Sequence, residues 1–255
     1  MEVFLNPDAW IALVTLTFLE IVLGIDNIIF ISIATGKLPA EKRKKATKLG
    51  MFLAMFMRIA LLFGINLLIQ MKEPWFHIDL SWFSAGITGQ SIILLLGGLF
   101  LIYKSTNEIR EKVDEKGHEE KEMKEAATKS FQNVILQIIM IDLVFSFDSI
   151  LTAVGMTNGV EGAIYIMITA VIISVFIMMQ FAVPVGNFVN KHPSIQILGL
   201  AFLILIGMML LTESAHLSNA LIFGSHVTPL PKGYLYFAIT FSLVVEMINM
   251  KIKKK

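Results

Sequence analysis

Residues 20–29 read EIVLGIDNII, and residues 142–151 read DLVFSFDSIL. The two stretches lie 122 residues apart and match position by position, with an acid at the first and seventh places of each. Both lie inside long apolar segments. A charged side chain at the centre of a bilayer costs roughly 2.5–3.5 kcal/mol on insertion scales. A chain that carries such acids twice, in register, is expected to use them on a cation or a proton.

The composition of the chain indicates a polytopic membrane protein. Of 255 residues, 56% are hydrophobic and only 16% are charged, and the mean hydropathy is +0.74. A soluble domain has about 25% charged residues. The absence of cysteine excludes disulfides and thiolate metal sites. The N-terminus lacks the basic region of a signal peptide, and nothing in the sequence indicates nucleic-acid binding or an enzyme.

Seven segments are apolar enough to span a membrane, which requires about 20 residues for roughly 30 Å of hydrocarbon. The expected fold is therefore all-α, with seven transmembrane helices. The predicted spans are residues 10–34, 49–71, 86–104, 131–156, 163–186, 195–213 and 233–250.

The distribution of basic residues predicts the orientation. Six Lys and Arg lie in residues 35–48 and seven in residues 104–130, and with Lys191 and the C-terminal tail they place eighteen of the 21 on one side. The opposite side has Lys72 and Lys232. Because cytoplasmic loops are enriched in Lys and Arg, the N-terminus is expected outside and the C-terminus in the cytoplasm.

The sequence similarity extends beyond the two acidic motifs. Residues 57–64 resemble 179–186 at the same offset of 122, and residues 96–102 share five of seven residues with 198–204. Two contiguous copies of a three-span unit must insert in opposite senses, because three is odd. This predicts the inverted-repeat plan of secondary transporters, with the substrate near the midplane.

The predicted organisation has four parts. They are a first three-helix repeat (1–103), a charged cytoplasmic linker (104–130), a second repeat (131–213), and a final part with an outer loop, the seventh helix and a basic tail (214–255). The linker has seven basic and eight acidic residues, and we interpret it as a solvated connector.

The polar residues of the two motifs form a set of oxygen donors, which suit Mn²⁺, Mg²⁺ and Ca²⁺. All five histidines are expected in loops, and the fifteen methionines are interpreted as packing and lipid contacts. The motif helices are either continuous or broken near Gly24 and Ser146, and we favour a break or kink in the first span. The candidate metal ligands are Glu20, Asp26, Asn27, Asp142, Asp148 and Ser149.

Five further polar residues are candidates for charge balance or gating. Arg58 is the lone cation within a span, and charge balance favours its pairing with the acids when no metal is bound. Glu246 and Asn249, near the inner end of the last span, are candidates for an inner gate. Glu213 and His216, at the outer end of the sixth span, are candidates for an exit vestibule.

Residues 18–27, residues 142–150, Arg58 and the ending 231–249 resemble the TerC family of integral membrane proteins. The resemblance covers nearly the whole chain. It implies Mn²⁺ efflux through the candidate ligands named above, because bacterial members of the family look like manganese exporters. The family is similar in plan to the larger LysE group of exporters.

The expected function is therefore export of a divalent cation, most simply Mn²⁺, from a bacterium across its inner membrane. No ATP-binding motif is present, so proton antiport through the central carboxylates is the simplest driving force. We expect no permanently bound cofactor, and the cation, protons and lipid as partners. The alternatives are a downhill divalent-cation channel and a membrane-assembly or secretion partner. An intramembrane aspartyl protease is discounted because its Tyr-Asp and Gly-x-Gly-Asp signatures are absent.

Overall fold

The computed structural model describes residues 6–114, 131–157, 160 and 162–253, with the side chains of Ile25, Asp26 and Asn66 outside the description. Within these ranges, seven helices are long and apolar enough to cross a membrane, as predicted. They are α1 (Pro7–Gly36), α2 (Ala40–Phe63), α4 (Gly89–Asp114), α6 (Phe131–Met156), α7 (Ala163–Lys191), α8 (Pro193–Leu217) and α9 (Lys232–Lys253). A short helix, α3 (Ile65–Gln70), follows α2.

The chain forms two compact units, and both include helices from each predicted repeat. The first unit contains α1, α2, α6 and α7. The second contains α3, α4, α8, α9 and a small sheet. The pairing of helices within a unit therefore depends on contacts between segments that are distant in the sequence.

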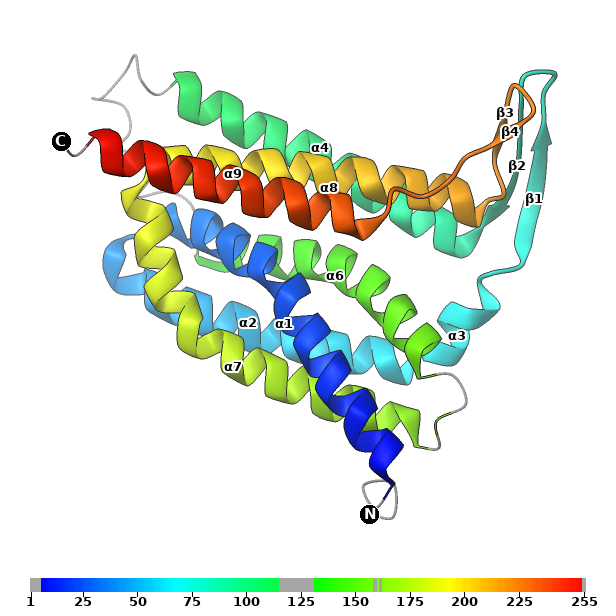
Figure 1. Cartoon of the computed structure of the whole chain (residues 1–255), viewed down its shortest axis with the longest axis horizontal. Helices are drawn as coiled ribbons and strands as arrows, with labels where there is room; N and C mark the ends of the chain where they lie inside the picture. The colour runs from blue at the N-terminus through cyan, green and yellow to red at the C-terminus, as the bar shows by residue number, and fades with distance from the viewer. Residues whose placement is uncertain (1–5, 115–130, 158–159, 161, 254–255) are drawn as a thin grey trace. The chain divides into compact units, whose positions relative to one another are not determined.

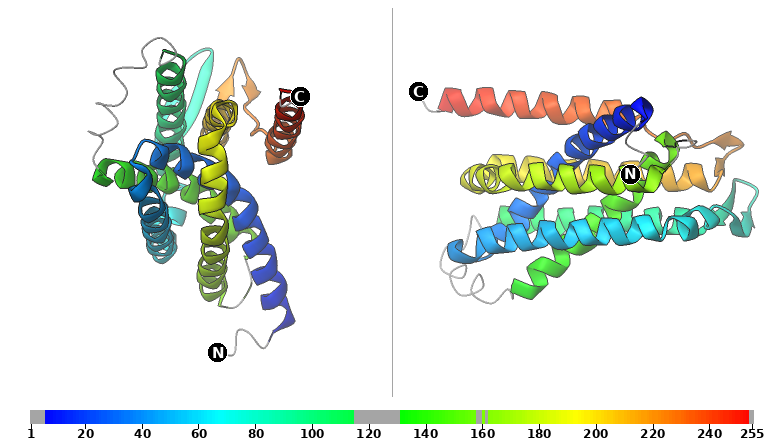
Figure 2. Two further views of the ribbon diagram at one scale, coloured as in Figure 1. Left: turned by 90° about the vertical axis from the view of Figure 1, so that its left-hand side faces the viewer. Right: turned by 90° about the horizontal axis from the view of Figure 1, so that it is seen from below.

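Helices pair in parallel within the first unit. α1 packs along α7, because Gly24 lies against Met178 and Gly36 against Asn190. The two helices begin at one end of the unit and finish together at the other (Figures 1 and 2). α2 packs along α6 in the same way. α1 also contacts α6, and α2 contacts α7.

The main helix pair of the second unit is α4 against α8, which run antiparallel. Ser214 Oγ near the end of α8 donates to the carbonyl of Ser91 near the start of α4, at 2.6 Å. Midway, a Cβ added at Gly98 would lie 2.7 Å from the carbonyl oxygen of Gly207, and one at Gly207 would lie 2.9 Å from that of Gly98. Small residues thus allow the close backbone approach that membrane helices use for packing.

The prediction of an all-α fold is wrong in one part of the second unit. Four strands form an antiparallel sheet in the order β1-β2-β3-β4, shown in Figure 1 beside the ends of α4 and α8. Phe223 and Gly224 both have positive φ in the two-residue turn between the last two strands, as such a hairpin requires. The strands are β1 (Pro74–Asp79), β2 (Phe83–Thr88), β3 (Leu221–Ile222) and β4 (Ser225–His226).

Several predicted boundaries also differ. α2 begins at Ala40, so most of the basic residues expected in a loop lie on its first turns. α4 continues to Asp114, and the predicted linker 104–130 therefore begins inside a helix, while residues 115–130 lie outside the described residues. α1 is helical through Gly24, so the expected break is wrong, whereas a kink at this place stays a prediction.

The histidines show the same kind of difference. They were expected in loops, but His77 lies in β1, His226 in β4 and His216 in the last turn of α8. His192 precedes α8 as its N-cap residue. His118 lies outside the described residues. The strands of the second hairpin, β3 and β4, have only two residues each, too few for a sequence pattern to show.

The buried faces of α2 and α7 follow a common register. Each of the seven buried residues of α2 matches a buried residue of α7 at an offset of 120, and also at 124, one helical turn later; on α2 they are Ala46, Thr47, Gly50, Met51, Ala54, Arg58 and Leu62. At the predicted offset of 122, most of these positions would instead match exposed or half-buried residues. The sequence alignment of these two spans was therefore wrong by two residues, whereas α1 and α6 keep the offset of 122, as buried Glu20, Asn27 and Ile28 match buried Asp142, Ser149 and Ile150.

Candidate metal-binding site

Three helices of the first unit place ionisable side chains together in its interior. Arg58 on α2 lies between Glu20 on α1 and Asp142 on α6. Its Nη1 is 2.5 Å from Glu20 Oε2, and its Nη2 is 2.5 Å from Asp142 Oδ1. The three residues are 3–5% exposed, so one guanidinium neutralises part of the charge of two buried carboxylates.

Asp142 has the more complete set of contacts. Arg58 Nε also donates to its Oδ2, at 3.2 Å, which makes the arginine contact bidentate. Ser146 Oγ donates to Oδ2 at 3.0 Å, and Asn27 Nδ2 donates to Oδ1 at 3.3 Å. Four hydrogen bonds from three helices therefore fix this carboxylate.

Asn27 carries an unused acceptor beside this cluster. The residue is 7% exposed, and no donor among the described residues reaches its Oδ1. A buried polar atom without a partner costs about 1–3 kcal/mol. Because this atom belongs to a side chain that contacts Asp142, its oxygen is available to a cation that binds beside that carboxylate.

The arrangement is a closed ion-pair cluster rather than a preformed metal cage. Among the described side chains, no three Asp, Glu or His residues are grouped as metal ligands. Two carboxylates and one guanidinium leave one negative charge if all are ionised. A divalent cation that replaced Arg58 would find two carboxylates and an amide oxygen on α1 and α6.

The remaining candidate ligands are Asp26 on α1 and Asp148 and Ser149 on α6. The side chain of Asp26 lies outside the described residues. Asp148 is half-buried on α6, and its carbonyl accepts from Thr152 Oγ1 at 3.0 Å. Ser149 is buried, and its Oγ donates to the carbonyl of Ser146 at 3.3 Å.

The four candidates for gating lie in the second unit. Glu213 is half-buried near the end of α8, and His216 is exposed in the last turn of that helix. Glu246 is half-buried and Asn249 is exposed, both on α9. Their roles as gate or vestibule remain predictions.

Sequence reasoning missed two polar positions. Ser146 was noted only as the counterpart of Gly24, yet it donates to Asp142. Glu108 was assigned to a solvated linker, but it is 1% exposed on α4 and pairs with Lys104 at 2.8 Å. The apolar periodicity that continues past residue 104 could have indicated that the helix extends this far.

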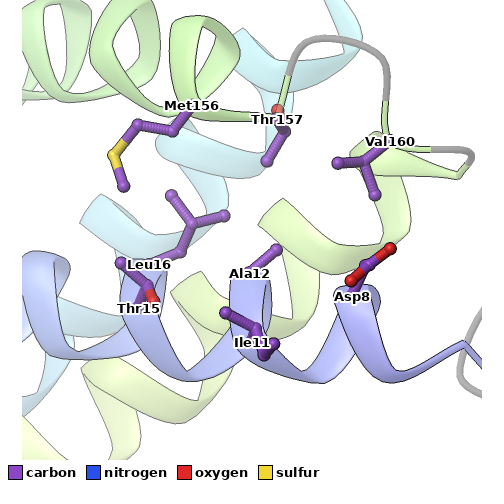
Figure 3. Close-up of a pocket in the computed structure, with 8 residues that line it drawn as sticks. All are labelled: Asp8, Ile11, Ala12, Thr15, Leu16, Met156, Thr157 and Val160. Carbon is purple, nitrogen blue, oxygen red and sulfur yellow. The ribbon is translucent and has the colours of Figure 1, made fainter.

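A cavity of about 280 Å³ lies beside the N-terminal half of α1, close to where α6 ends (Figure 3). Its innermost residue on α1 is Leu16, one helical turn before Glu20. Most of the lining is apolar, with three polar side chains; the residues are Asp8, Ile11, Ala12, Thr15, Leu16, Met156, Thr157 and Val160.

Comparison with known proteins identifies the family. A family model described as "Integral membrane protein TerC family" matches residues 5–255. The chain belongs to the TerC family. The TerC resemblance drawn from the acidic motifs is thereby confirmed, and the chain is a multi-pass membrane protein.

Two TerC relatives match nearly end to end. The chain is 46% identical to a "UPF0053 protein" of Haemophilus influenzae over 98% of this chain and 96% of that one. It is also 46% identical to the "UPF0053 inner membrane protein YgdQ" of Escherichia coli K12, with the same coverage. The E. coli protein YoaE, also named an inner membrane protein, is 41% identical over 98% of this chain but only 44% of its own length. No solved structure matches.

Proposed function

We propose that this TerC protein is a divalent-cation exporter of the bacterial inner membrane, with Mn²⁺ as its cargo and protons as the exchanged ion. The observation that carries the proposal is the buried Glu20–Arg58–Asp142 cluster. Ionisable residues within membrane spans are rare and commonly mark ion pathways. The names of the family and of the relatives indicate no catalytic activity.

Arg58 acts as a tethered substitute for the cargo. Its guanidinium contacts both carboxylates, which a cation between α1 and α6 would also have to contact. When the cargo arrives, Arg58 leaves, and the unused Oδ1 of Asn27 joins the carboxylates as a neutral donor. Because removal of one partner leaves a buried charge uncompensated, the two carboxylates would not stay empty and ionised together.

Export needs a source of free energy. Movement of a 2+ ion outward against an inside-negative potential of 100 mV costs roughly 4.6 kcal/mol, at about 2.3 kcal/mol per charge. Carboxylates that bind the cation when ionised and protons after its release would exchange the two without a further domain. Two protons per Mn²⁺ would make the exchange electroneutral, so the pH gradient alone would drive it.

The repeat supplies a route to alternating access. α1 and α6 carry equivalent motifs, and each packs in parallel against one other helix, α1 against α7 and α6 against α2. The predicted repeat relates the first pair of helices to the second. Inverted repeats that rock around a central site are the common plan of secondary transporters. On the predicted orientation the cavity beside Asp8 and Leu16 is on the outer side of Glu20, where exported cargo would leave.

Flux into proteoliposomes tests the function. Purified protein is reconstituted with a trapped Mn²⁺ indicator, and uptake is measured with and without an imposed pH gradient. Wild-type protein and the control Glu41→Gln, an exposed residue on α2, should accumulate Mn²⁺ above equilibrium, whereas Glu20→Gln and Asp142→Asn should not. Flux that only dissipates the Mn²⁺ gradient would favour a channel. Absence of flux, with cellular function retained by both variants, would favour an assembly or secretion partner.

A further inference from the structure

A buried methionine of α7 lies against the acidic motif of α1. Met178 on α7 is 4% exposed, and its sulfur packs directly on Gly24 of α1. A Cβ at Gly24 would collide with this sulfur and would lie 3.0 Å from the Met178 Cε. Gly24 is one helical turn from both Glu20 and Asn27 on the buried face of α1, so the thioether packs on the face of α1 that carries these two residues.

The placement of Met178 on α7 can be compared with that of Arg58 on α2. Met178 follows Arg58 by 120 residues, one of the two offsets, 120 and 124, at which the buried faces of α2 and α7 coincide. Ser146 follows Gly24 by 122 residues, the offset that relates α1 to α6. Arg58 and Ser146 both donate to Asp142 Oδ2. α2 therefore presents a guanidinium to the carboxylate of α6, and α7 presents a thioether to the acidic motif of α1.

We propose that Met178 determines the specificity of the site, by providing a thioether that favours transition-metal dications over Ca²⁺ and Mg²⁺. The inference rests on the proposed function of the site and narrows its substrate class. Carboxylate and carbonyl oxygens alone suit Mg²⁺, Ca²⁺ and Mn²⁺ alike. Sulfur is a soft, polarisable donor, from which the hard alkaline-earth ions gain least.

The position of the thioether is expected to weaken the binding of Ca²⁺ and Mg²⁺. Met178 fills the space over Gly24, where a water molecule or a further oxygen donor would otherwise complete the shell of a hard cation. Ca²⁺ takes six to eight oxygen ligands and Mg²⁺ retains several waters, so both lose a partner there. A transition-metal ion accepts the sulfur in place of that oxygen.

The test compares metal binding and transport in Met178→Leu with wild type. Leucine conserves the volume and removes only the sulfur, and such swaps cost little stability. Isothermal titration of the purified full-length protein with Mn²⁺ and with Ca²⁺ gives the ratio of the two affinities. Mn²⁺ flux into proteoliposomes, in competition with Ca²⁺, gives the same ratio for transport. Met51→Leu is the matched control, since Met51 is equally buried, on α2, two turns from Arg58.

We expect Met178→Leu to lower the preference for Mn²⁺ over Ca²⁺ by about tenfold, the low end of what loss of a group that supports a metal site costs. Met178→Gln, which replaces the sulfur with an oxygen donor, should shift the ratio further toward Ca²⁺, and Met51→Leu should leave it unchanged. Folded Leu or Gln variants with an unchanged ratio would overturn the role of Met178, although Mn²⁺ export would stand. A wild-type protein that binds and moves no dication would instead overturn the proposed function.

Discussion

Arg58 and Asp142 meet in a two-point contact inside the first unit, with Nη2 2.5 Å from Oδ1 and Nε 3.2 Å from Oδ2. The residues are 84 positions apart in the chain and lie on neighbouring parallel helices. The same guanidinium reaches Glu20 on a third helix. A single side chain thus connects the two acidic motifs, and its removal is the most direct way to expose their charge.

Replacement of Arg58 by Gln should lower stability and strengthen metal binding at once. Loss of one partner from a buried ion pair costs about 3–5 kcal/mol, because the other charges are left uncompensated. Added Mn²⁺ should recover much of that loss, since the cation no longer has to displace a tethered one. The melting temperature in detergent, with and without Mn²⁺, measures both effects. A variant as stable as wild type and indifferent to Mn²⁺ would contradict the role of Arg58.

Asp142→Asn should destabilise the protein more than Glu20→Gln. Asp142 accepts four hydrogen bonds, two of them from Arg58, and an amide nitrogen at one of its oxygens would oppose those donors. Glu20 is joined to Arg58 through one oxygen. The free energy of unfolding in detergent checks the order. The reverse order would show that the α1 side of the cluster carries more of the stability.

Asp26→Asn and Asp148→Asn should each abolish manganese tolerance in cells while the protein remains folded. Both acids belong to the repeated motif, and neutralisation of an intramembrane acid relieves a burial cost. Growth on graded Mn²⁺ and the cellular Mn²⁺ content measure the effect, with expression checked by immunoblot. Either variant that lowers cellular Mn²⁺ as wild type does would remove that residue from the ligand set.

Manganese efflux should acidify the cytoplasmic compartment. Protons must return as the cation leaves, because the buried carboxylates of Glu20 and Asp142 would otherwise be left without a full counter-charge. Proteoliposomes with a trapped pH dye report the proton movement, and an ionophore that collapses the pH gradient should stop accumulation of Mn²⁺. Mn²⁺ flux without proton movement would reject antiport.

Gly98→Val should disrupt the second unit. Any Cβ at this position would lie 2.7 Å from the carbonyl oxygen of Gly207, and backbone cannot move aside as a side chain can. We expect a loss of about 1–3 kcal/mol, the usual cost of overpacking. Gly155→Val on α6 is the control, because nothing lies within 4 Å of its Cβ position. Equal melting temperatures for the two variants would contradict close packing of α4 on α8.

The sequence by itself determined the seven spans and the two acidic motifs, and these carry the resemblance to the TerC family. Long apolar runs are local properties, because every backbone group in lipid must be satisfied within its own helix or barrel. Acids in such runs can also be recognised from the sequence, because a charged side chain within the bilayer costs free energy whatever its neighbours are. Hydropathy alone does not locate helix ends. α4 extends to Asp114, ten residues beyond the predicted end at 104, because Lys, Glu and Arg are good helix formers outside the membrane.

Only the tertiary structure decided how the helices pair and which polar groups meet. The role of Arg58 as a bridge, the buried state of Glu108 and the contact of Met178 with Gly24 all depend on faces of different helices. Apolar segments resemble one another, so sequence similarity placed the second and fifth spans two residues out of register. Burial corrected the register, because a shift of two residues turns a helix by about 200° and moves its packed face toward lipid.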